Sequence, residues 1–205
     1  MERLLLAAAV GVWAAIHSWL ASINMKGLAA RMLGAAATRS YRLAYNVFSV
    51  LSFVPIALLM RATPDRLLYT IQFPWAALML AAQAIAAILM LATLLQTDTL
   101  HFAGISQLLG RKSGGGLVTT GFYRIVRHPL YLFGLLILWL TPFMSVNQLT
   151  VYSVLTIYLF VGGMLEERRL VKEYGAAYDE YRARTPMIIP APGWRRREIE
   201  RRTDP

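Results

Sequence analysis

The chain has 205 residues, of which 57% are hydrophobic and 16% charged, and it carries a formal net charge of +10 with no cysteine. A charged fraction well below the roughly 25% of soluble proteins argues against a soluble domain, and the lack of cysteine excludes disulfides and thiolate metal sites. The basic residues lie between or after apolar blocks, where they would face anionic lipid headgroups, so the positive charge does not indicate nucleic acid as a partner.

Four stretches contain no Asp, Glu, Lys or Arg: residues 4–25, 43–60, 67–97 and 130–165. A membrane-spanning helix needs about 20 apolar residues, so the first three stretches predict helices at 4–24, 43–60 and 71–95. The first is interpreted as a retained helix and not a signal peptide, because no isolated small-residue cleavage site follows it. His17 lies within this helix, where a polar side chain should either line a substrate cavity or bind a neighbouring helix.

The fourth stretch would be about 54 Å long as one helix at 1.5 Å per residue, which is too long for one span. Thr141, Pro142 and the segment 145–148 supply turn residues in its middle. We therefore expect a helical hairpin at 129–143 and 148–165. The sequence thus predicts an all-α integral membrane protein with about five membrane helices, followed by a helix in the C-terminal segment.

Basic residues gather in the first loop, in the third loop and in the C-terminal tail. The positive-inside rule places these segments in the cytoplasm, with the N-terminus outside, in what we expect to be a bacterial inner membrane. One membrane domain, 1–205, is expected, and it is divided into three N-terminal helices (1–97), a cytoplasmic loop (98–128), the hairpin (129–165), a C-terminal segment (166–190) and a basic tail (191–205).

The segment GFYRIVRHPLYLFG, residues 121–134, places its polar groups immediately before the hairpin. Pro129 suits the first turn of a helix, and Arg127, Tyr131 and Gly134 share one face of that helix by their spacing. This line of residues could hold a polar ligand at the mouth of the helix bundle. Positive-inside placement of the arginine and the aromatic belt of membrane proteins explain it equally without a ligand.

A second group of polar residues follows the hairpin. Glu166 and Glu167 lie among basic residues, where they could bind an amine, ribose hydroxyls or Arg127, or where Glu166 could pair with Arg169 on the helix surface. Four apolar and aromatic residues recur at helical spacing beyond them and could stack on a purine or pack at the bilayer interface: Leu170, Tyr174, Tyr178 and Tyr181. His101 could be a ligand or an interface residue. Three scattered histidines do not indicate a metal site.

The stretches TTGFYRIVRHPLYLFG (119–134) and EERRLVKEYGAAYDEYRARTPMIIP (166–190) together resemble the isoprenylcysteine carboxyl methyltransferase superfamily. The signature of that superfamily has Gly-x-Tyr, Arg-His-Pro-x-Tyr, a hairpin, a Glu-Glu pair, Tyr-x-x-Tyr and a closing proline, in this order, and the match covers residues 117–190. The N-terminal segments HSWLAS, YRLAYNVFSVLSFVP and HFAGISQL look more like the bacterial NnrU-like and thiol-methyltransferase branches.

The resemblance implies a membrane enzyme that binds S-adenosylmethionine on the cytoplasmic side, releases S-adenosylhomocysteine and takes a lipophilic or small-molecule methyl acceptor from the lipid membrane. The segment 166–190 would cover the cofactor. Arg127 and Glu167 are the expected catalytic residues, and His17 is expected to bind the acceptor. The expected cofactor-binding residues are Leu117, Val118, Gly121, His128, Tyr131, Glu166, Glu167, Tyr178 and Tyr181.

Two departures from the family pattern bear on the acceptor. Phe133 stands where the family usually has glycine, and Gly134 follows it. The eukaryotic enzymes carry a basic residue shortly before the Glu-Glu pair, thought to orient the substrate carboxylate, where this chain has residues 162–164, Gly-Gly-Met. A smaller or differently charged acceptor is therefore at least as compatible with the sequence as a prenylcysteine carboxylate.

Two alternative functions fit parts of the same pattern. NADPH-dependent steroid and sterol reductases look similar at Arg-His-Pro-x-Tyr, although they often place a glutamate close behind the motif, where this chain has Leu135 and Leu136. A non-catalytic helix bundle that assists a partner complex is the third interpretation. A competition experiment between NADPH and S-adenosylmethionine would separate the reductase from the methyltransferase.

Overall fold

A computed structural model describes residues 1–96 and 116–191, apart from the side chains of residues 23, 33 and 35–39. His101, most of the predicted cytoplasmic loop and nearly all of the basic tail lie outside the described residues. Within them the elements follow in the order α1 (Glu2–Ala21), α2 (Ile23–Leu51), α3 (Val54–Ala62), β1 (Leu67–Thr70), α4 (Trp75–Gln96), the 3-10 helix η1 (Gly121–Arg124), α7 (Pro129–Trp139), β2 (Phe143–Ser145), α8 (Val146–Tyr174) and α9 (Ala176–Arg184).

Four helical segments in the described part of the chain are long and apolar enough to cross a membrane: Glu2–Ala21, Ser40–Ala62, Trp75–Gln96 and Val146–Tyr174. The protein is therefore an integral membrane protein built mainly of helices. The sequence predicted a fifth helix at 129–143, and the corresponding α7 is apolar but has only 11 residues. At 1.5 Å per residue it is about 17 Å long, short of the roughly 30 Å hydrocarbon core.

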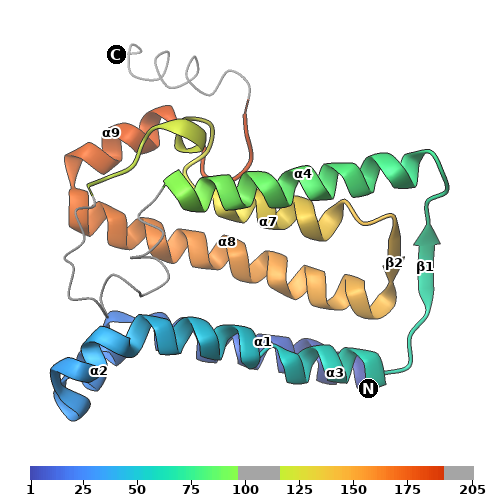
Figure 1. Ribbon diagram of the computed structural model, residues 1–205, viewed down its shortest axis with the longest axis horizontal. Helices are drawn as coiled ribbons and strands as arrows, with labels where there is room; N and C mark the ends of the chain where they lie inside the picture. The colour runs from blue at the N-terminus through green and yellow to red at the C-terminus, as the bar shows by residue number, and fades with distance from the viewer. Residues whose placement is uncertain (97–115, 192–205) are drawn as a thin grey trace, which may run out of the picture.

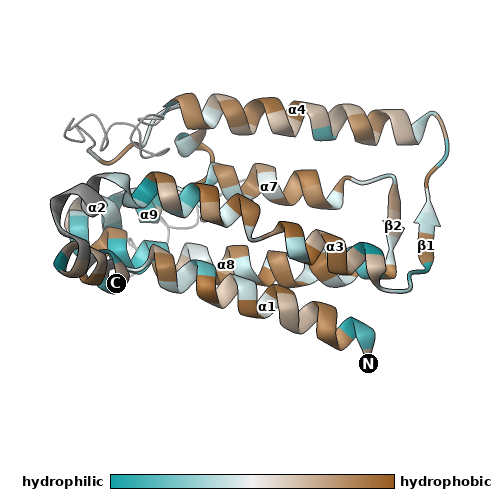
Figure 2. Cartoon of the chain, turned by 60° about the horizontal axis from the view of Figure 1, so that its bottom comes forward, coloured by the Kyte–Doolittle hydropathy of each residue, from teal (hydrophilic) through white to brown (hydrophobic). Residues whose placement is uncertain are grey.

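The helices lie roughly side by side along the long axis of the molecule (Figure 1). α1 packs against α8, and α4 packs against α7. A buried apolar cluster of Leu6, Val10, Ile56 and Val151 joins α1, α3 and α8. Hydrophobic residues are frequent along α4, α7 and α8, whereas hydrophilic residues are frequent in α9 (Figure 2). Large hydrophobic side chains of α4 and α8 are exposed, among them Leu78, Ile88 and Ile157. Such outward apolar surfaces suit contact with lipid.

A small antiparallel sheet corrects the all-α expectation. β1 pairs with β2, with Leu67 opposite Ser145 and Thr70 opposite Phe143. The two strands come from segments more than 70 residues apart, so their pairing depends on tertiary contacts and leaves little trace in local sequence. The turn predicted at 145–148 is instead the start of α8, where Ser145 and Gln148 form a reciprocal capping box.

Buried polar contacts hold this end of the molecule together. The Asn147 side chain is fully buried, and its Nδ2 donates hydrogen bonds to the carbonyl oxygens of Met60, at 3.3 Å, and Thr63, at 3.0 Å. The Asn147 backbone N–H donates to Asp65 Oδ1 at 3.0 Å. The connection between α3 and β1 is thereby fixed to the first turn of α8, because buried polar groups need partners.

The opposite end of the molecule gathers the segments that the sequence singled out. α8 continues to Tyr174, beyond its expected end at 165, and Gly175 then turns the chain into α9 with a φ of 56°. Figure 1 shows the end of α1, the start of α7, the end of α8 and α9 at this end, with β1 and β2 at the other. Residues distant in sequence therefore meet around the start of α7.

Candidate functional site

The Arg-His-Pro stretch and the C-terminal segment are bound together by their backbones. The N–H of Arg127 donates to the carbonyl oxygen of Pro186 at 2.9 Å, and the N–H of His128 donates to that of Met187 at 3.0 Å. The Tyr181 hydroxyl donates to the Tyr123 carbonyl oxygen at 2.6 Å. The start of α7 and the segment after α9 therefore form one unit, as the sequence motif required.

Arg127 is the buried centre of this unit. Its guanidinium contacts Glu167 Oε1 on α8 through Nε and Nη2, each at 2.6 Å. Nη1 donates to the carbonyl oxygens of Arg182, at 3.0 Å, and Thr185. Only 6% of the Arg127 side chain and 12% of the Glu167 side chain are exposed. A guanidinium with so many protein partners holds three chain segments together.

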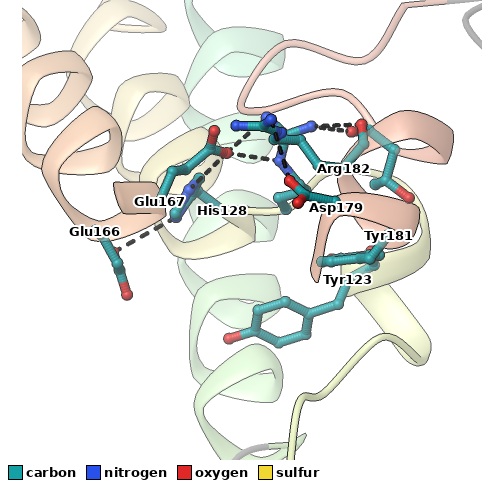
Figure 3. Close-up of polar contacts among 9 residues, drawn as sticks. Tyr123, His128, Glu166, Glu167, Asp179, Tyr181 and Arg182 are labelled. Carbon is teal, nitrogen blue, oxygen red and sulfur yellow. Dashed lines mark hydrogen bonds and ion pairs between the residues drawn. The ribbon is translucent and has the colours of Figure 1, made fainter. Parts of the chain in front are cut away.

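His128 lies between two carboxylates. Its Nδ1 is 3.5 Å from Glu166 Oε2, and its Nε2 is 3.4 Å from Glu167 Oε1, a distance at which the charges interact although no hydrogen bond forms. Figure 3 shows the imidazole between the two glutamates. The ring also stacks on Tyr131, with centroids 5.2 Å apart, and the Tyr131 hydroxyl donates to Glu166 Oε2 at 2.9 Å. Glu166 is the more accessible carboxylate, with 47% of its side chain exposed.

The two carboxylates determine the charge of His128. Burial acts to lower the pKa of the imidazole, but Glu166 and Glu167 outweigh it, so the pKa of His128 is raised. The folded pKa then exceeds the unfolded value of about 6.5, so protonation stabilises the fold fully below that pH, and the contribution is lost as pH rises through the folded pKa.

We therefore expect the melting temperature in detergent to fall more between about pH 6 and pH 9 in the wild type than in a His128→Gln variant, which cannot take up the proton. Thermal unfolding of both proteins at the two pH values measures this difference. Equal changes in the two proteins would show that His128 does not titrate with the fold.

A cavity of about 630 Å³ opens beside this unit. Its wall includes most of the residues expected to bind cofactor or acceptor, namely Leu117, Val118, Arg127, His128, Tyr131, Glu166, Tyr178, Tyr181 and His17. Glu167 and Gly121 are not among the lining residues. Glu167 contacts Arg127 and His128, so it lies behind the wall.

Gly121 has a structural role that explains the residue type. Its φ is 61°, a conformation that favours glycine, and a Cβ at this position would lie 2.3 Å from the side-chain oxygen of Gln96. The same oxygen accepts a hydrogen bond from the Phe122 N–H at 3.1 Å. The glycine allows η1 to dock onto the end of α4, and its contact with a cofactor stays a prediction.

Sequence reasoning missed much of the other end of the cavity. Tyr45 on α2 and Tyr158 on α8 line it together with His17. The Tyr45 hydroxyl is 2.6 Å from His17 Nε2, so His17 contacts a neighbouring helix and also lines the cavity. Its binding of the acceptor stays a prediction. Tyrosines inside apolar helices were the available signal, but the same residues are common where a helix meets the membrane interface.

The fold and the cavity define a helical membrane protein with a cavity whose wall includes Tyr178 and Tyr181 of the C-terminal segment. The chain belongs to the family described as a protein of unknown function (DUF1295), which matches residues 30–185.

Relatives with named activities were also found. The chain is 32% identical over 194 residues to the methanethiol S-methyltransferase of a Pseudomonas species, covering 88% of this chain and 70% of the relative. It is 49% identical over 72 residues to the methanethiol S-methyltransferase of Crocosphaera subtropica, covering 35% of this chain and 28% of that relative. With methanethiol S-methyltransferase 2 of Bradyrhizobium diazoefficiens it shares 43% identity over 91 residues, or 44% of this chain and 35% of the relative.

The last two alignments span about a third of those relatives' own length. No solved structure matches the chain. The resemblance to membrane methyltransferases of the isoprenylcysteine carboxyl methyltransferase type is confirmed by these relatives.

Proposed function

We propose that the protein transfers a methyl group from S-adenosylmethionine to a small acceptor that reaches the cavity from the membrane, and that the acceptor is a thiol. The observation that carries this proposal is the cavity itself, in which Glu166, His128 and several tyrosine rings face one space. The thiol is suggested by the names of the relatives, which act on methanethiol.

The cavity fits the proposed cofactor. Its volume of about 630 Å³ falls in the roughly 300–1,000 Å³ range of pockets that enclose ligands of this size. The half-exposed Glu166 carboxylate can attract a cation, and tyrosine rings can stack on adenine or face a positive charge. The buried Tyr178 hydroxyl has no hydrogen-bond partner in the part of the chain that the structure describes. Burial and the Glu167 charge raise the pKa of Tyr178 to about 12, so the hydroxyl remains a donor.

When bound, S-adenosylmethionine supplies a methyl group on a positively charged sulfonium, and S-adenosylhomocysteine is left. Glu166 and Tyr131 would bind the charged groups of the cofactor, while Tyr178 and Tyr181 would lie near the adenosine. Leu117 and Val118 line the same cavity. The protein has mainly to align the acceptor and exclude water, because the leaving group is already activated.

Arg127 and Glu167 were expected to be catalytic, and their contacts favour a different role. Arg127 directs its donors at Glu167 and at backbone carbonyl oxygens. We therefore propose that both act as positioning residues, which keep His128 and the segment after α9 against the cavity.

The same proposal includes the topology. Residues 1–205 would form one membrane domain, with α7 and α8 as the hairpin and 166–190 covering the cofactor. The cavity end would face the cytoplasm of a bacterial inner membrane, with the N-terminus outside, because the basic residues Lys26 and Arg42 of the first loop line the cavity.

The test is methyl transfer by purified protein in lipid nanodiscs. With labelled S-adenosylmethionine and methanethiol we expect labelled dimethyl sulfide, and S-adenosylhomocysteine should compete with the cofactor. Parallel reactions with a prenylcysteine and with membrane extract, analysed by mass spectrometry for a gain of one methyl group, test other acceptors. Affinity for NADPH with none for S-adenosylmethionine would instead support the reductase.

A further inference from the structure

The cavity has a second polar end, on the helices of the N-terminal half. The hydroxyl of Tyr45 lies 2.6 Å from Nε2 of His17, which brings α2 and α1 together inside segments that can span the membrane. A polar side chain within a membrane-spanning segment costs free energy unless it is paired. Such residues often have a functional role. Both residues line the cavity.

The surroundings hold this pair in one arrangement. Trp13 stacks on the His17 ring with centroids 5.0 Å apart, and Tyr158 meets the same ring edge-on at 5.8 Å. The Trp13 indole N–H donates to Ser52 Oγ at 2.9 Å. A rigid pair at the wall of a cavity is pre-organised to bind a ligand.

The hydrogen-bonding capacity of the pair leaves room for one more partner. The Tyr45 hydroxyl has one proton, and His17 Nε2 is its nearest acceptor, since the His17 carbonyl oxygen is farther away at 3.4 Å. A hydroxyl that donates once can still accept through its oxygen. The other ring nitrogen, Nδ1, has no hydrogen-bond partner among the described residues. If the Tyr45 hydroxyl donates to Nε2, the proton of the neutral imidazole lies on Nδ1.

We propose that Tyr45 and His17 form the acceptor end of the cavity and remove the proton from a thiol acceptor. The S–H bond of the thiol breaks as an O–H bond forms at Tyr45, whose original proton moves to His17 Nε2. The electron pair of the S–H bond would stay on sulfur and form the bond to the methyl group. The bond between that methyl group and the donor sulfur would break, and its electron pair would stay on the donor sulfur of S-adenosylhomocysteine. This assignment rests on the methyl transfer proposed above.

A proton acceptor is needed for this class of substrate and not for a carboxylate. The thiolate is the nucleophile, and a thiol with a pKa of about 8.5 is mostly protonated at neutral pH. Removal from water disfavours the thiolate further. As the imidazolium of His17 forms, the positive charge of the methyl donor disappears, so the net charge in the cavity does not change and the transfer avoids creating a buried charge.

The groups that face Tyr45 are compatible with this role. Tyr41 lies one turn earlier on α2, and Tyr158 and Arg169 approach from α8. The positive charge of Arg169 favours a thiolate nearby over a thiol. Lys26 lies close to Arg169, and its positive charge adds to the positive field at this part of the cavity.

Three variants test the assignment. Tyr45→Phe keeps the ring and removes the hydroxyl, and His17→Gln keeps a hydrogen-bond acceptor that cannot take up a proton. Tyr69→Phe is the matched control, because it removes a tyrosine hydroxyl away from the cavity, one that donates to the Thr141 carbonyl oxygen at 3.3 Å. We expect kcat with methanethiol at pH 7 to fall by about 100-fold in the first two variants, the typical contribution of a general base, and by less than about twofold in the control.

Two further readouts separate proton removal from a structural effect. The affinity for S-adenosylhomocysteine should stay within about twofold of the wild type, and the deficit in kcat should shrink as pH approaches 10, where the thiol ionises without help. A deficit that is the same at every pH would overturn the proposal. Full activity of Tyr45→Phe would also overturn it while leaving the methyltransferase intact, whereas no transfer by the wild type would overturn both.

The tautomer can be measured without cofactor or acceptor. The chain has three histidines, so nitrogen-15 histidine labelling gives three ring systems, and His17→Gln identifies the signals of His17. The proposal requires an unprotonated Nε2 that responds to Tyr45→Phe and not to Tyr69→Phe. A protonated Nε2 in the wild type would overturn the relay, because His17 would then donate to Tyr45 and could not receive its proton.

Discussion

Replacing Arg127 by methionine is expected to lower the free energy of unfolding by about 3–5 kcal/mol, the cost of leaving one partner of a buried ion pair alone. The variant leaves the Glu167 carboxylate without its guanidinium and the carbonyl oxygens of Arg182 and Thr185 without a donor. The segment after α9 should then separate from the start of α7, and cofactor affinity should fall with it. Chemical unfolding in detergent and calorimetric titration with S-adenosylhomocysteine measure the two effects.

Two comparisons isolate the cause. Arg184→Met removes an exposed ion pair with Glu180 on α9, which is worth at most about 0.5 kcal/mol. The double variant Arg127→Met with Glu167→Met should recover a large part of the lost stability, because replacing both partners by apolar side chains leaves no unpaired charge. An Arg127→Met protein as stable as Arg184→Met would contradict the role assigned to the guanidinium.

Glu166→Gln is expected to have the opposite profile, with little change in stability and a large change in binding. The carboxylate is half exposed and lines the cavity. A hydrogen bond to a charged ligand group contributes about 1.5–3 kcal/mol, so the affinity for S-adenosylmethionine should fall roughly 10- to 100-fold. Titration of both variants with the cofactor gives the affinities, and unfolding gives the stabilities.

The affinity of Glu166→Gln for S-adenosylhomocysteine shows which group of the cofactor Glu166 binds. If Glu166 binds the amino group, the affinity for S-adenosylhomocysteine falls by the same factor, whereas a carboxylate that faces the sulfonium matters only for the charged cofactor. Glu167→Gln is the matched comparison, since it changes the same residue type behind the wall and should lower stability as well. An unchanged affinity of Glu166→Gln for both molecules would contradict the placement of the cofactor in this cavity.

Several features of the protein could be predicted from the sequence because they depend on local composition. The apolar stretches predicted the helices α1, α4 and α8, because a membrane-spanning helix needs a continuous run of residues that lipid can surround. The order Arg-His-Pro, Glu-Glu and Tyr-x-x-Tyr indicated that two distant stretches cooperate. His128, Glu166 and Tyr181 do meet around one cavity.

Other features could not be predicted because they depend on contacts across the chain. The length of α7 is limited by the pairing of β2 with β1, and the capping box at Ser145 then starts α8. Glu166 and Glu167 were both expected to bind the cofactor, and Glu167 was expected to be catalytic as well. Only their opposite positions around His128 separate an accessible carboxylate from one that is paired with Arg127.

The sequence by itself determined that the chain enters a membrane and that charged residues flank its apolar stretches, because transfer of apolar and charged groups between water and lipid depends on residue type. The tertiary structure decided which polar groups face the cavity and which hold it together. The tertiary structure also brought Tyr45 into contact with His17, and no spacing in the sequence predicted this contact. Burial and pairing are properties of a three-dimensional neighbourhood, and the hydrogen bonds between helices exist only after the helices pack.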